Sequence, residues 1–158
     1  LYEINDKAEK LRDPEERGSA ALRTLALLIK QGDNSSVGDL YRTIGERVHD
    51  GGEEFTSETL RKALVDAGLD ENLERDALGD ESTIDLVLAD HNRAVEEVGG
   101  FGVPTIILPS GEGIFGPVVT IAPTGEEAGE LWDHVRWLTE HDDFFELKRE
   151  RGERRPGR

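Results

Sequence analysis

Residues 102–118 read GVPTIILPSGEGIFGPV, and this stretch decides the fold class. Residues 105–108 are β-branched or apolar, residues 109–113 are rich in turn-forming types, and residues 114–116 begin a second short apolar run. Such an order favours a β-hairpin. Proline has no N–H to donate to a sheet, so Pro104 marks the entry to the first strand.

The chain on both sides of this hairpin has helical periodicity. The first predicted helix is capped by Asp13, ends near Gln31 and buries Leu22, Leu25, Ala26, Leu28 and Ile29. Three further helices are predicted from Val37 to His49, from Thr56 to before Gly68, and from Asp70. A longer helix is predicted after Asp80. One face of it carries a mainly apolar stripe that consists of Ile84, Val87, Leu88, His91, Ala94, Val95 and Val98. A last helix, capped by Thr124, carries Leu131, Val135 and Leu138 on its inner face.

Two short strands do not form an independently stable sheet. Methionine is absent, including at position 1. We therefore expect further strands upstream of Leu1, which would make the chain a helical insertion followed by the second half of an α/β domain.

Composition excludes several classes of function. The 158 residues fit one domain, and the formal charge of −16 would repel nucleic acid and anionic membranes. The sequence contains neither a run of apolar residues long enough to span a bilayer nor a secretion signal at residue 1, which favours the cytoplasm. Cysteine is absent, so the printed chain holds no disulfide, no thiolate metal site and no catalytic cysteine.

Pro104 has two interpretations at this stage. It is either an ordinary trans proline at the start of a strand, or a cis proline that leaves the N–H and C=O of Val103 free to pair with an extended substrate. The histidines are also ambiguous. His91 lies on an apolar stripe and either packs there or faces a cleft, and no two histidines have the spacing of zinc ligands on one helix face.

Several motifs together resemble a known family. One set of motifs resembles the C-terminal half of DsbA-like thioredoxin-fold oxidoreductases. It consists of His91, the GVPT tetrapeptide, residues 114–118 and the final helix. A second set of motifs resembles, more narrowly, the actinobacterial mycothiol-dependent reductases, often called nitroreductases. These motifs are Asn5, residues 40–49 with an Arg-x-His pattern at Arg47 and His49, residues 115–118, residues 125–133 and residues 144–149.

This resemblance implies an α/β thioredoxin-like fold with an inserted helical domain. Residues 1–5 would end a truncated N-terminal half, residues 6–98 would form the insertion, residues 99–147 would form the C-terminal half, and residues 148–158 a basic tail. It also implies an N-terminal β-α-β unit with a Cys-x-x-Cys motif that is missing from the printed sequence.

The resemblance further implies a thiol–disulfide oxidoreductase that acts on mixed disulfides or small reducible substrates through a thiolate outside the printed sequence. Val103, Pro104, Asn5, His49 and His91 would bind the substrate. Mycothiol or a similar small thiol would be the co-substrate, with no bound cofactor or metal, and a homodimer remains open. The alternative is a non-catalytic thioredoxin-like binding module that keeps the cis-proline cleft and has no thiol centre.

Overall fold

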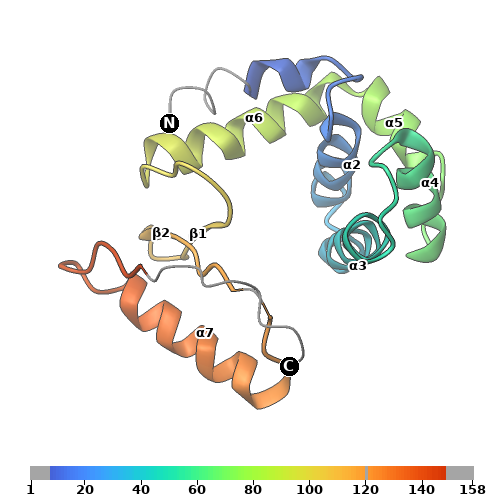
Figure 1. Cartoon of the computed structure of the whole chain (residues 1–158). Helices are drawn as coiled ribbons and strands as arrows, with labels where there is room; N and C mark the ends of the chain where they lie inside the picture. Colours follow the sequence, from blue (N-terminus) through green and yellow to red (C-terminus); the bar gives the residue numbers. More distant parts are fainter. Residues whose placement is uncertain (1–7, 120, 149–158) are drawn as a thin grey trace. The chain divides into compact units, whose positions relative to one another are not determined.

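The computed structural model describes residues 8–119 and 121–148, and the chain divides into two compact units, Leu1–Phe101 and Gly102–Arg158. The structure is mixed α/β and mostly helical (Figure 1). The first unit contains the 3-10 turn η1 (Glu9–Arg12), helices α2 (Ser19–Lys30) and α3 (Asn34–Gly45), the π-helical turn η2 (Glu46–Asp50), and helices α4 (Ser57–Asp66), α5 (Leu73–Gly79) and α6 (Glu81–Glu96).

Helix α2 is the centre of the helical unit. It packs against α3, α5 and α6, while α3 packs against α4 (Figure 1). The main core cluster consists of fully buried Ala21, Leu28, Leu40, Leu60, Ala63 and Leu64. A smaller cluster of Ala8, Ile84 and Leu88 joins the start of the described chain to α6.

The predicted start of the first long helix is wrong. Helix α2 begins at Ser19, and its N-cap is Gly18 with φ +89°, a left-handed conformation that interrupts helical propagation from Asp13. The Asp13 carboxylate instead accepts a hydrogen bond from the Glu15 N–H at 3.0 Å, which is an Asx-type turn. The side chains of Leu22 and Ile29, expected on the buried side, are 40% and 49% exposed.

Other helix boundaries follow the sequence more closely. Side chains of Asp33, Thr56 and Asp80 accept hydrogen bonds from backbone N–H groups in the first turns of α3, α4 and α6. The short helix after Asp70 begins at Leu73, because Asp70 accepts from the Asn72 N–H at 2.9 Å and forms a turn. The α6 stripe is confirmed, since every predicted member from Ile84 to Val98 is buried or half-buried.

The C-terminal unit contains the predicted hairpin. Strands β1 (Thr105–Ile107) and β2 (Gly113–Phe115) are antiparallel, with Ile106 opposite Ile114. Helix α7 (Gly125–Thr139) follows; Thr124 is its N-cap residue but makes no side-chain capping hydrogen bond. The hairpin and the mixed α/β class are therefore confirmed.

The C-terminal unit has a thin core. Within its described part, Leu108 is a buried apolar side chain at 3% exposure, while Trp132, Trp137, Phe145 and Leu147 are exposed. None of the helices in the part of the chain that the structure describes is long and apolar enough to cross a bilayer. The predicted remnant at residues 1–5, and the basic tail beyond Lys148, lie outside the described residues.

Candidate functional site

Val103 and Pro104 stand at the entry to strand β1. The Val103–Pro104 peptide bond is cis, as is Gly116–Pro117. The Pro104 carbonyl accepts a hydrogen bond from the Gly116 N–H at 2.9 Å, so Pro104 is joined to the hairpin. Within the described ranges, neither the N–H nor the C=O of Val103 makes a hydrogen bond, and the residue is 89% exposed. This segment can therefore offer one donor and one acceptor to an extended partner.

The residue before Val103 is packed closely. A Cβ added at Gly102 would lie 3.1 Å from Cε2 of the Phe115 ring. The Gly102 carbonyl accepts from the Thr105 hydroxyl at 2.7 Å, across the Val103–Pro104 pair. These two contacts hold the backbone on both sides of Val103, so that its free groups are presented from a fixed frame.

His49 lies on the π-helical turn η2, which continues directly from the end of α3. Single π-helical turns are rare and often occur at functional sites. The His49 side chain is exposed, and it makes no hydrogen bond, ion pair or ring contact with any residue that the structure describes. Its ring nitrogens are thus available to a ligand.

Arg47, two residues before His49, joins the turn to its surroundings. Its guanidinium bonds to the Asp66 carboxylate at 2.8 Å from Nε and 2.6 Å from Nη2, and to the Glu53 carboxylate at 2.6 Å from Nη1. The hydrogen bond with Asp66 raises the pKa of Arg47 above its ordinary value. The cation is therefore permanently charged and fixes η2 to the end of α4.

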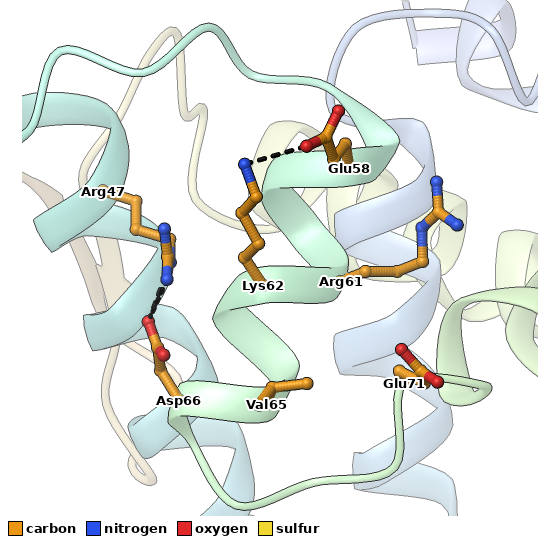
Figure 2. A pocket seen from close by; sticks show the side chains of 7 residues that line it. All are labelled: Arg47, Glu58, Arg61, Lys62, Val65, Asp66 and Glu71. Carbon is orange, nitrogen blue, oxygen red and sulfur yellow. Dashed lines mark hydrogen bonds and ion pairs between the residues drawn. The ribbon is translucent and has the colours of Figure 1, made fainter.

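Arg47 also lines a shallow hollow of about 490 Å³ beside α4, shown in Figure 2. The lining residues are Arg47, Glu58, Arg61, Lys62, Val65, Asp66 and Glu71. Lys62 and Glu58 form an ion pair at 2.9 Å, which raises the pKa of Lys62 and lowers that of Glu58. Three cations face three carboxylates, so the hollow has no excess charge to attract an anion.

The remaining predicted site residues are dispersed. His91 is half-buried on α6, and among the described residues no hydrogen bond, ion pair or ring contact joins it to His49. Val103 and Pro104 belong to the other unit, and Asn5 lies outside the described residues. Across residues 8–119 and 121–148, no three histidine, aspartate or glutamate side chains are grouped to hold a metal ion.

The helical unit and the hairpin together define a mixed, mostly helical α/β protein. The family described as Rv2466c-like, mycothiol-dependent nitroreductase Rv2466c, matches residues 1–149. The chain therefore belongs to the Rv2466c-like mycothiol-dependent nitroreductase family, which confirms the resemblance to the mycothiol-dependent reductases.

The chain is also similar to a mycobacterial protein. The chain is 35% identical over 153 residues to "Uncharacterized protein Rv2286c" of Mycobacterium tuberculosis (strain ATCC 25618 / H37Rv). The match covers 94% of this chain and 65% of the relative, so the chain spans just under two thirds of the relative's length.

Sequence reasoning named Arg47 only as part of a pattern and missed its two carboxylate partners. Asp66 is 19 positions away in sequence, and no spacing rule connects it to Arg47. The paired glycines Gly51 and Gly52 were a usable signal, because a Cβ at Gly51 would lie 2.7 Å from the Arg47 carbonyl oxygen. A glycine required by close backbone approach indicates a constrained turn.

Proposed function

We propose that the protein to which this chain belongs is a mycothiol-dependent thiol–disulfide oxidoreductase with a DsbA-like thioredoxin fold interrupted by the helical unit. The family match over residues 1–149 is the observation that carries this proposal. The predicted hairpin and the free backbone groups of Val103 agree with it. The 158 residues contain no cysteine, so the reacting thiolate would belong to a segment outside them.

The proposed step is an exchange of disulfides. A protein thiolate attacks one sulfur of mycothiol disulfide, a protein–mycothiol S–S bond forms as the original S–S bond breaks, and one mycothiol leaves as a thiolate. A lone pair of the protein sulfur forms the new S–S bond, and the electron pair of the broken S–S bond goes to the departing mycothiol, so the protein thiolate is oxidised and one mycothiol is reduced. Mycothiol is therefore a co-substrate of the reaction and not a resident cofactor.

The described residues would contribute binding. Val103 would pair its N–H and C=O with the extended part of the thiol partner, next to Pro104. Asn5, His49 and His91 would be further substrate-binding residues. A low-molecular-weight thiol would be used in the cytoplasm, where such thiols keep proteins reduced.

The experiment uses the protein as its gene encodes it. Intact mass and a thiol titration under denaturing conditions come first, followed by incubation with mycothiol disulfide. We expect at least one titratable thiol and a mass gain of one mycothiol, removed by reductant. Absence of any thiol and of any adduct would overturn the enzymatic proposal and favour a non-catalytic binding module.

A pair of matched variants tests the binding role of the Val103 segment. Val103→Asp places a carboxylate where mycothiol disulfide is expected to bind, and repulsion between this carboxylate and the departing mycothiol thiolate should slow adduct formation several-fold. Ile121→Asp places the same charge at another exposed apolar position of this unit, 66% exposed, and should leave the rate unchanged. Equal rates for both variants would contradict the assignment of Val103.

A further inference from the structure

We infer that Arg47 is a positioning residue that holds the turn η2 in the conformation that presents His49 to the thiol substrate. This inference rests on the proposed function, because it takes His49 to be a substrate-binding residue. Nothing in the sequence pattern alone gives Arg47 this role. It follows from how the side chain and the backbone of Arg47 are both held.

The side chain of Arg47 connects three parts of the helical unit. From η2 it reaches Asp66, the last residue of α4, and Glu53, in the segment between η2 and α4. The Arg47 side chain is only 23% exposed, which protects these ion pairs from part of the solvent screening. A guanidinium is suited to this bridging because its donors lie in one rigid plane.

The backbone of Arg47 is held as well. Its carbonyl accepts from the Glu53 N–H at 3.0 Å, so one residue contacts Glu53 through both its main chain and its side chain. The Gly51 N–H bonds to the Glu46 carbonyl at 2.8 Å and closes the π-helical turn. Gly51 is also pressed against the Arg47 carbonyl, where a Cβ would lie at 2.7 Å.

His49 sits between these fixed points and has no partner of its own among the described residues. Its orientation is therefore set by the backbone of η2, and that backbone is set by Arg47. Arg42 provides the contrast, because its partners Asp39 and Glu46 are three and four residues away along the same stretch of helix. The ion pairs of Arg42 are longer, at 3.4 Å to Asp39 and 3.0 Å to Glu46, and they do not connect η2 to α4.

The experiment is a double-mutant cycle between Arg47→Gln and His49→Ala in the protein as its gene encodes it, with mycothiol disulfide as the probe. Here kcat/KM stands for the second-order rate constant for formation of the mycothiol adduct. A misplaced contact group costs a large fraction of the rate, so we expect Arg47→Gln to lower kcat/KM roughly 10-fold when His49 is present. In the His49→Ala background the same substitution should change kcat/KM less than about 2-fold. Arg42→Gln should leave kcat/KM unchanged.

Each outcome bears on a different assignment. An equal fold-loss from Arg47→Gln in both backgrounds would overturn the positioning role and leave the role of His49 intact. A normal rate for His49→Ala alone would overturn the substrate role of His49, and the inference with it. Unchanged rates for Arg47→Gln in the presence of an active His49 would overturn the inference alone.

A milder variant covers the case in which Arg47→Gln does not fold. Asp66→Asn removes one charged partner while Glu53 remains, and it should give an intermediate loss that again disappears with His49→Ala. The His49 imidazole signals in NMR spectra supply a readout without turnover. They should shift in Asp66→Asn and stay in place in Arg42→Gln, and unshifted signals in Asp66→Asn would contradict the inference.

Discussion

Arg23 on α2 donates a hydrogen bond from Nε to the hydroxyl of Thr83 on α6 at 3.0 Å, and both side chains are fully buried. Nη2 of the same guanidinium reaches the carbonyls of Ala77 at 3.3 Å and Leu78 at 3.0 Å, at the end of α5. The last carbonyls of a helix have no partner within the helix, and a cation is favourable there. One buried cation therefore joins three helices of this unit.

Replacing Arg23 by methionine is expected to destabilise the helical unit by roughly 2–4 kcal/mol, because buried carbonyls lose their donors and a similar-sized apolar chain supplies none. Urea denaturation followed by circular dichroism measures this free energy of unfolding. Arg12→Met is the matched control: Arg12 is exposed and its ion pairs with Glu9 and Asp85 are on the surface. Its effect should be much smaller than that of Arg23→Met, and an equal effect at both positions would contradict the buried role.

Acid should weaken the same unit through Asp80. The hydrogen bond from Lys30, with those from Ser82, lowers the pKa of Asp80 to about 2. Its folded pKa lies below the unfolded value of about 3.9, so the stabilisation is present above that value and is lost as pH falls toward 2. Asparagine caps helices as well as aspartate. Asp80→Asn should therefore flatten the change of unfolding midpoint between pH 4 and 2, and an unaltered pH profile would contradict the assignment.

Two glycines of one segment should respond oppositely to alanine. At Gly51 a Cβ would lie 2.7 Å from the Arg47 carbonyl oxygen, so the backbone of η2 must move and Tm should fall by several degrees. At Gly45, the last residue of α3, a Cβ meets nothing within 4 Å. Alanine is the better helix former by about 1 kcal/mol, so Gly45→Ala should raise Tm. A fall in Tm at both positions would show that the close approach is not the cause.

Hydrogen exchange should distinguish the two units of the 158-residue chain. Amides of α4, where Leu60 and Leu64 are fully buried, should be among the slowest to exchange. Amides of residues 105–107 and 113–115 should exchange much faster, because a two-stranded hairpin is marginally stable by itself. Mass spectrometry of exchanged peptides measures both, and equal protection would contradict this difference.

The parts of the fold that sequence predicted depend on local signals. The cap residue Thr56 accepts from the Thr59 N–H, so the residue that marks the start of α4 is close in sequence to the group it binds. The hairpin likewise follows from a short apolar run and its turn. The start of α2 was predicted wrongly at Asp13 because the left-handed turn at Gly18 separates Asp13 from the helix. A glycine in the sequence does not by itself predict such a turn.

The interior polar contacts could not be predicted for a different reason. Arg23 lies 60 positions from Thr83, and a basic residue among apolar ones is usually a solvent-facing position. The burial of Arg23 depends on where the end of α5 lies in the folded unit. The periodicity of apolar residues in the sequence does not predict that position. For the candidate site, the sequence pointed to Val103 and His49 through family motifs, whereas the clamp formed by Arg47, Glu53 and Asp66 needed the three-dimensional structure.

The thin core of the C-terminal unit has a spectroscopic consequence. Both tryptophans of the sequence, Trp132 and Trp137, lie on α7 with 45% and 61% of their surface exposed, and the helical unit has none. Indole emission therefore reports on the C-terminal unit alone, while ellipticity at 222 nm is dominated by the helical unit. A single urea titration that follows both indole emission and ellipticity at 222 nm resolves the unfolding of one unit from that of the other, without any label or substitution.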